Sequence, residues 1–183
     1  LTSSLEETNQ WYAIAKIAGL KLIEATNIQY NKNHVSLMPT NLYGQNDNFH
    51  LKNSHVIPAM IRKFYEASML RHGKVTLWGD GSPIRDLIYT DDVAKGMIHM
   101  VENEVTEPVN LGSGDGVTIK EVADIIASYF HKDIKWDVTK PMGDFKRLMS
   151  TERAESFGFK PETSLENGII KTIQWYKEFN SVL

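Results

Sequence analysis

Apolar residues recur along the chain at two spacings, and the spacing changes from one segment to the next. Steps of three and four residues predict helices over residues 9–31, 55–70, 91–102, 119–130, 151–157 and 164–179. Short apolar runs predict strands over residues 35–38, 75–78, 86–89, 108–111 and 135–138, with a polar loop over 40–53. This alternation is typical of an α/β protein with short parallel strands.

Polar residues stand where several of these helices are predicted to begin. Ser54 and Thr90 are expected to cap the helices that follow them, because a side-chain oxygen can accept a hydrogen bond from an N–H group of the first turn. Thr118 and Glu121 have the spacing of a capping box. Ser164 is expected to cap the last helix in the same way.

The first predicted helix has no strand before it in the sequence. Because helices in an alternating α/β chain cover neighbouring strands, the strand partner of this helix is expected in a preceding segment. We therefore expect the sequence to be the C-terminal part of a larger protein. One side of the helix would let another helix or a flat ligand approach closely, since it carries Ala15, Ala18, Gly19, Leu22 and Ile23.

Composition narrows the class of protein. The 183 residues are 42% hydrophobic and 23% charged, which is enough to bury a core. A net charge of -3 gives no electrostatic reason to expect nucleic acid or a membrane as partner. No apolar run approaches about 18 residues and the first residues do not resemble a signal peptide, so we expect a cytoplasmic location. The absence of cysteine excludes disulfides, thiolate metal sites and a cysteine nucleophile within this chain.

Tyr12 and Lys16 are candidates for acid/base chemistry. They stand four residues apart near the start of the first predicted helix, so their side chains lie one above the other. A phenol can exchange a proton where a neighbouring cation favours its charged form. The spacing alone favours a surface tyrosine beside a solvated lysine over an acid/base pair.

The glycine-rich segment and the histidines give weaker evidence for a functional site. The glycine-rich segment 112–116 follows a predicted strand, but its G-x-G-x-G spacing differs from the G-x-G-x-x-G of dinucleotide sites, which favours a structural turn over a phosphate cradle. The six histidines are not arranged with carboxylates at metal-ligand spacings, so we expect no metal site.

Several longer motifs follow the strand at 35–38: Pro39-Thr40-Asn41-Leu42-Tyr43-Gly44, Asp47-Asn48-Phe49-His50 and Asn53-Ser54-His55-Val56-Ile57-Pro58. Before them, residues 12–19 read Y-A-I-A-K-I-A-G; after them come Trp78-Gly79-x-Gly81-x-Pro83 and Arg85-Asp86-x-Ile88-Tyr89-x-Asp91-Asp92. Together these motifs resemble the extended short-chain dehydrogenase/reductase family, and within it the epimerase-reductases of GDP-4-keto-6-deoxymannose. The resemblance extends over nearly the whole chain.

The resemblance implies a fold and a division of the chain. The fold would be the C-terminal part of a Rossmann-type enzyme, namely the end of the parallel sheet plus a smaller α/β substrate-binding domain. Residues 1–53 would complete the Rossmann domain, and residues 54–183 would mainly bind the nucleotide sugar, with a return to the sheet near 75–112.

The resemblance also implies roles for individual residues. Tyr12 would be the catalytic acid/base, with Lys16 as its electrostatic partner and a ligand of the ribose of NADP(H). His55 would transfer a second proton and contact the cofactor. The nicotinamide end would be lined by residues 39–42, and the substrate would be held by Asn41 and by three residues at the GDP end. The full sets are Lys16, Pro39, Thr40, Asn41, Leu42 and His55 for the cofactor, and Asn41, Lys63, Trp78 and Arg85 for the substrate.

The implied activity is NADPH-dependent 3,5-epimerisation and 4-reduction of GDP-4-keto-6-deoxy-D-mannose to GDP-L-fucose, carried out by a longer homodimeric enzyme. The dimer would form through the first helix and the helix at 91–102. Because the cofactor loop would lie in a preceding segment, we expect this chain alone to be inactive and to bind NADPH no better than millimolar. Two alternatives stay open: another nucleotide-sugar epimerase or reductase, or a non-catalytic nucleotide-sugar binding fragment.

Two departures from the family pattern concern the substrate. Lys140-Pro141-Met142-Gly143 stands where the family has Lys-Pro-Asp-Gly, and Phe145-Lys146-Arg147 stands where it has Pro-Arg-Lys. The contact expected from the acidic position is therefore not carried over to Met142.

Overall fold

The computed structural model describes residues 4–51, 53–70 and 73–181. A short 3-10 helix, η1 (Glu7–Asn9), leads into the 21-residue helix α1 (Gln10–Tyr30). Asn31 ends α1 in the left-handed region, with φ 48°, and its N–H group donates to the carbonyl of Asn27. The Asn27 side-chain amide then donates to the His34 carbonyl at 2.7 Å and accepts from the His34 N–H group at 3.0 Å. These contacts turn the chain back towards the first strand.

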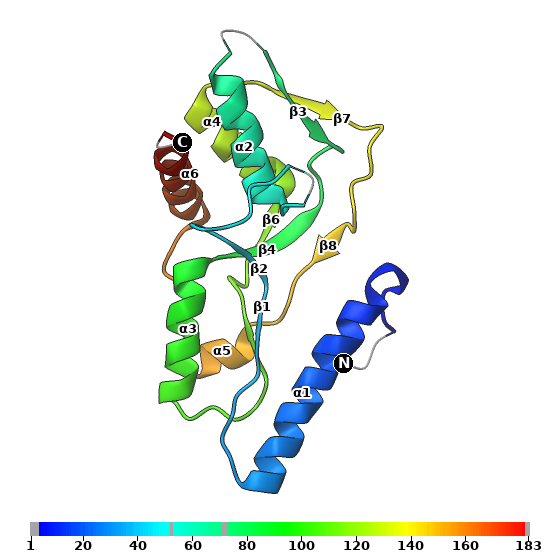
Figure 1. The fold of residues 1–183 in the computed structure, drawn as a ribbon, viewed down its shortest axis with the longest axis vertical. Helices are drawn as coiled ribbons and strands as arrows, with labels where there is room; N and C mark the ends of the chain where they lie inside the picture. Colours follow the sequence, from blue (N-terminus) through cyan, green and yellow to red (C-terminus); the bar gives the residue numbers. More distant parts are fainter. Residues whose placement is uncertain (1–3, 52, 71–72, 182–183) are drawn as a thin grey trace.

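The described strands form three small groups (Figure 1). β1 (Leu37–Pro39) pairs in parallel with β5 (Val109–Leu111), and β3 (Val75–Trp78) pairs in parallel with β7 (Ile134–Asp137). In the third group β4 (Ile84–Tyr89) pairs in parallel with β2 (Asn41–Tyr43) and β8 (Lys146–Arg147), and antiparallel with β6 (Gly116–Thr118). The predicted α/β class with parallel strands is confirmed.

The larger hydrophobic core lies under three helices in the upper half of Figure 1. They are α2 (Val56–Ser68), α4 (Ile119–Phe130) and α6 (Leu165–Ser181). Each turns apolar residues spaced three or four apart towards the strands β2, β3 and β4. The most deeply buried side chains of this core are Tyr43, Ile57, Ile61, Phe64, Tyr89, Val122, Ala123, Ile126, Ile169 and Ile173.

A smaller core lies below it, where α3 (Thr90–Glu102) and α5 (Glu152–Ser156) cover β1 and β5. Gly96 makes the packing of α3 possible, because a Cβ at this position would lie 2.8 Å from the ring of Phe159. β4 joins the two cores, since Ile88 points into the smaller one whereas Leu87 and Tyr89 point into the larger one. The boundary expected near residue 53 remains a prediction.

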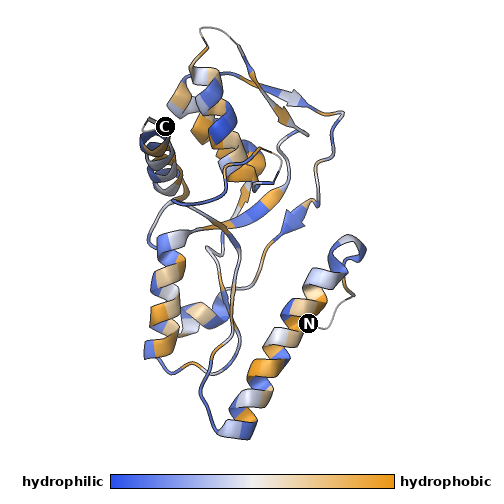
Figure 2. Ribbon diagram, viewed as in Figure 1, coloured by the Kyte–Doolittle hydropathy of each residue, from blue (hydrophilic) through white to orange (hydrophobic). Residues whose placement is uncertain are grey.

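Helix α1 stands apart from both cores (Figure 1). Leu20 is the one buried residue within α1, while Leu22 is 66% and Trp11 76% exposed. Figure 2 shows hydrophobic positions along the whole length of this helix. The face with Ala15, Ala18 and Gly19 is thus open to solvent in the described structure.

Two of the expected helix caps are confirmed and two are wrong. Thr118 and Glu121 form the capping box of α4, and the Ser164 hydroxyl accepts from the N–H of Asn167 at 3.3 Å. Ser54 does not cap α2, because His55 is the N-cap residue and the Ser54 hydroxyl has no partner among the described residues. Thr90 is the first residue of α3 rather than its cap.

Three short strands were not predicted. β2 lies in the segment expected to be a polar loop, β6 lies beside the glycine-rich turn, and β8 has only two residues. Their backbone groups pair with positions of β4 that lie 30 or more residues away in sequence in each case. A period of two cannot be recognised in two or three residues, so such strands are set by tertiary pairing.

Tyr43 anchors α6 to the sheet. Its hydroxyl donates to the Leu165 carbonyl at 3.4 Å, and burial, followed by the nearby Asp92 carboxylate, raises the pKa of this phenol. Gly168 leaves room for the ring, because a Cβ there would lie 2.4 Å from the Tyr43 hydroxyl oxygen.

Replacing Gly168 with alanine is expected to lower the free energy of unfolding by about 1–3 kcal/mol, because the added methyl group overpacks a buried ring. Urea denaturation measures this change. Asn167→Ala, at the adjacent exposed position, is the control and should change the free energy by less than about 0.5 kcal/mol. Equal denaturation midpoints for Gly168→Ala and the unaltered chain would contradict the proposed packing.

Candidate functional site

Tyr12 and Lys16 lie together on the exposed side of α1. The Lys16 ammonium is 5.3 Å from the centroid of the Tyr12 ring, and Tyr12 is 60% exposed. An i,i+4 pair on a helix brings the two side chains to this separation without help from tertiary contacts. The structure therefore brings the predicted phenol and cation together.

The residues expected at the cofactor lie where two parallel strands end. Pro39 is the last residue of β1, and the N–H of Thr40 donates to the Leu111 carbonyl at the end of β5, at 2.9 Å. The Asn41 side chain donates to the carbonyl of Asp86 at 3.0 Å. In open α/β sheets ligands bind beyond the carboxyl ends of the strands, and these residues occupy that edge.

Asp86 holds this edge together from inside. One oxygen of its buried carboxylate accepts from the N–H of Ser113 at 2.9 Å and from the Ser113 hydroxyl at 2.8 Å, with the Thr40 hydroxyl at 3.4 Å. Gly112 is required beside it, because a Cβ would lie 2.5 Å from the other carboxylate oxygen. The glycine-rich segment is therefore a turn tied to Asp86, as the sequence predicted.

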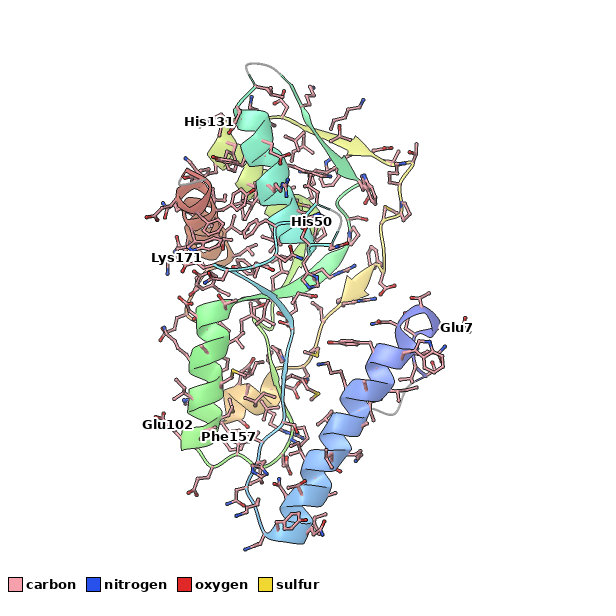
Figure 3. All side chains as sticks on the ribbon, viewed as in Figure 1. Glu7, His50, Glu102, His131, Phe157 and Lys171 are labelled. Atoms are coloured by element: carbon pink, nitrogen blue, oxygen red, sulfur yellow. The ribbon has the colours of Figure 1, made fainter. Side chains whose placement is uncertain are left out.

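His55 lies on a different element from Tyr12. It is the exposed N-cap residue of α2, and its carbonyl accepts from the N–H of Ala59 at 3.1 Å. His50, labelled in Figure 3, lies in the loop that leads to it. Among the described residues, no hydrogen bond joins His55 to Tyr12. The structure does not bring these two expected proton-transfer groups into contact.

Lys63 and Trp78, expected at the GDP end, lie close to each other. The Lys63 ammonium, on α2, donates to the Thr76 carbonyl at 3.4 Å and lies 6.0 Å from the centroid of the Trp78 ring. Trp78 ends β3 and is 63% exposed. An exposed indole beside an ammonium can stack on a base or support a phosphate group.

Arg85 is fixed by the backbone around it. One of its terminal nitrogens donates to the carbonyls of Ile84 and Asp144, at 2.8 and 2.9 Å. Burial, and then the positive charge of Arg147, lower the pKa of Arg85. Arg85 and Arg147 are direct register partners in the parallel pair of β4 and β8. Like charges at paired positions repel, so an anion between these guanidinium groups would stabilise the arrangement.

Arg147 was missed by the sequence analysis, which treated residues 145–147 only as a departure from the family pattern. Its position opposite Arg85 depends on β8, a strand too short to predict. The Arg147 guanidinium also pairs with the Asp144 carboxylate. The signal in the sequence was the adjacent cations Lys146 and Arg147, one of which had to share a face with Arg85.

The part of the chain that the structure describes contains no group of three His, Cys, Asp or Glu side chains that could hold a metal ion. Over the same residues, every helix is too short or too polar to cross a lipid bilayer.

Comparison with known proteins gives a consistent result. Residues 1–112 match the family described as "NAD dependent epimerase/dehydratase family". "Putative GDP-L-fucose synthase 2" from Arabidopsis thaliana is 46% identical over 181 residues, which are 97% of this chain and 55% of that protein. "GDP-L-fucose synthase" from Escherichia coli K12 is 44% identical and is matched over 59% of its length. The chain thus spans little more than half the length of these curated relatives.

A solved structure supports the same relationship. The GDP-mannoheptose C4 reductase MlghC from Campylobacter jejuni, with NADP bound, is 28% identical and superimposes with a TM-score of 0.82. The superposition covers 97% of this chain and 62% of that one.

Arg147→Met is expected to weaken the binding of inorganic pyrophosphate at least about tenfold, because a hydrogen bond to a charged group contributes about 1.5–3 kcal/mol. Calorimetric titration at low ionic strength measures the affinity. Lys146→Met is the matched control, since Lys146 pairs with Ile84 and alternation turns it to the other face of the strand. An equal loss in both variants would show that only overall charge matters.

Proposed function

The chain belongs to the NAD dependent epimerase/dehydratase family, and on that basis we propose that it forms the substrate-binding and proton-transfer part of a GDP-L-fucose synthase. Such an enzyme epimerises carbons 3 and 5 of GDP-4-keto-6-deoxy-D-mannose and reduces carbon 4 with NADPH. The relatives at 44–46% identity that carry this name support the proposal. Because the chain spans about half of their length, the activity is proposed for a longer polypeptide.

The observation that carries the proposal is the pairing of Arg85 with Arg147. The Asp144 carboxylate pairs with Arg147 and offsets part of the repulsion between the two guanidinium groups, and their remaining planar donors match phosphate oxygens. Trp78 and Lys63 add an exposed ring and a further cation. A nucleoside diphosphate supplies both a base for the ring and two phosphates for the cations.

The residues at the carboxyl ends of β1 and β5 fit the nicotinamide end of NADPH. Pro39, Asn41 and Leu42 are exposed at this edge, and Asp86 fixes the neighbouring backbone through Thr40 and Ser113. We assign the cofactor ribose to Lys16, and nicotinamide contacts to residues 39–42 and to His55. When bound, NADPH supplies the hydride for carbon 4.

Proton transfer is assigned to Tyr12 and His55. Carbons 3 and 5 flank the 4-keto group, so removal of a proton from either one gives an enolate whose oxygen needs a hydrogen-bond donor. The Tyr12 phenol would provide that donor, and the Lys16 ammonium would stabilise the phenolate that remains. His55 would act on one face of the ring as the acceptor or donor of the carbon-bound proton, and a further proton-transfer group of the longer polypeptide would act on the opposite face.

The same phenol would serve the second reaction. Once both centres are inverted, reduction at carbon 4 creates a new alkoxide, and Tyr12 would protonate it. Proton transfer at carbon would thus depend on Tyr12 and His55, whereas reduction would depend on Tyr12 and Lys16.

A second candidate is reduction of a related GDP-linked keto sugar without epimerisation. Its support is the likeness to the GDP-mannoheptose C4 reductase, with a TM-score of 0.82. The two functions differ in whether solvent hydrogen enters carbons 3 and 5.

His55→Gln in the full-length polypeptide is expected to block the exchange of solvent deuterium into carbons 3 and 5, while a substrate that is already epimerised is still reduced. Tyr12→Phe should impair both steps, by about 10²–10⁴-fold, because the phenol acts in each. Mass spectrometry of the sugar and NADPH oxidation measure the two steps separately.

Normal exchange in His55→Gln would contradict the role of the imidazole. Ketone reduction at the unaltered rate in Tyr12→Phe would contradict the role of the phenol. Tyr30→Phe, at the exposed C-terminal end of α1, is the matched control and should leave both steps unchanged.

We further propose a homodimer formed by α1 and α3. α1 exposes an apolar face beside its small residues, and α3 exposes a second apolar strip away from its buried side: Met97, Ile98 and Val101. Burial of large apolar side chains on association would supply the driving force.

Leu22→Glu is expected to convert the dimer into a monomer at micromolar concentration, because a carboxylate would be buried in an apolar interface. Light scattering of the full-length polypeptide measures the mass. Lys21→Gln is the control, since it removes only an exposed ion pair with Glu24. A monomeric unaltered polypeptide would rule out the dimer.

A further inference from the structure

The segment between β7 and β8 forms a strap across the GDP end of the candidate site. Met142 packs on Gly79, where a Cβ would lie 2.7 Å from the Met142 side chain. Two residues later, the Asp144 carbonyl accepts from Arg85 at 2.9 Å. The strap therefore runs from the turn beside Trp78 to Arg85.

Lys140 lies near the start of this strap. Its ammonium lies 6.0 Å from the centroid of the Trp78 ring, the same separation as that of Lys63. The two lysines come from different elements, α2 and the strap, and meet at one exposed indole. Among the described residues, neither ammonium forms an ion pair with a carboxylate.

The carboxylate nearest in sequence to Lys140 is engaged elsewhere. The side chain of Asp137 accepts from the N–H and the hydroxyl of Thr139, at 3.2 and 2.6 Å. These bonds, and then the charges of Lys140 and Lys135, lower the pKa of Asp137. Asp137 is thus a charged residue fixed by its own turn, rather than a side chain that binds Lys140 directly.

Lys63 and Lys140 each place an ammonium 6.0 Å from the centroid of the Trp78 ring, and Arg85 and Arg147 pair at the other end of the strap, where the Asp144 carboxylate offsets one of the charges. Mutual repulsion opposes this arrangement, and each long side chain also loses rotamer entropy when it is held in place. A multiply charged anion relieves the repulsion and provides acceptors for several donors at once. Stacking of a base on the Trp78 ring would not by itself require a second cation beside that ring.

We propose that Lys140 is a further substrate-binding residue, which acts with Lys63 at Trp78 to hold the diphosphate of the nucleotide sugar. The inference rests on the proposed function, because it assigns the ligand of the same site. The strap positions Lys140 through the contact of Met142 with Gly79, so an apolar side chain at position 142 has a structural role there.

Lys140→Met in the full-length polypeptide is expected to raise the dissociation constant for GDP about tenfold and to make binding less sensitive to salt, because one cation no longer faces the phosphates. Lys140→Arg should restore most of the affinity. Lys135→Met is the matched control, since Lys135 also acts on Asp137 but not on the Trp78 ring, and it should stay within about twofold.

Calorimetric titration with GDP and with guanosine separates the possible outcomes. A tenfold loss for GDP with little change for guanosine supports the phosphate contact. If the unaltered polypeptide binds GDP and Lys140→Met binds it equally well, the role of Lys140 is wrong while the proposed function stands. If the unaltered polypeptide does not bind GDP at millimolar concentration, the proposed function fails and the inference fails with it.

Discussion

The geometry of this site depends on the hydrogen bonds that the buried carboxylate of Asp86 accepts. It binds the turn after β5 through Ser113 and reaches the Thr40 hydroxyl after β1, while its own backbone carbonyl receives the Asn41 side chain. A buried charge is tolerated only with such donors, and loss of its partners would cost several kcal/mol. Because Arg85 precedes Asp86 in β4, the hydrogen bonds of Asp86 also fix the position of Arg85 relative to the residues at the carboxyl ends of β1 and β5.

The Tyr12–Lys16 pair obeys a different constraint. Helical spacing alone brings Lys16 to the Tyr12 ring, but α1 lies outside both hydrophobic cores and keeps an open apolar face. Lys63, Trp78, Arg85 and Arg147 are brought together by contacts within the described residues, whereas no hydrogen bond among these residues joins Tyr12 to His55.

Local signals predicted most of the fold and part of the site. The period of α1, the capping box at Thr118 and the pair Tyr12–Lys16 each involve residues within four positions, so the sequence contains the whole interaction. Arg147 and the strap at Lys140 could not be found in this way, because their partners on β4 and β3 lie more than fifty residues away. At Ser54 a local signal gave a wrong prediction. This residue type is suited to capping, but Ser54 stands one position before His55, which is the N-cap residue of α2.

We propose that this chain recognises a GDP-linked keto sugar for combined epimerisation and reduction. The decisive experiment is product analysis by NMR after the full-length polypeptide has acted on GDP-4-keto-6-deoxy-D-mannose and NADPH. We expect GDP-L-fucose, formed with one equivalent of NADPH oxidised. A reduced product that retains the original configuration at carbons 3 and 5, or no turnover at all, would contradict it.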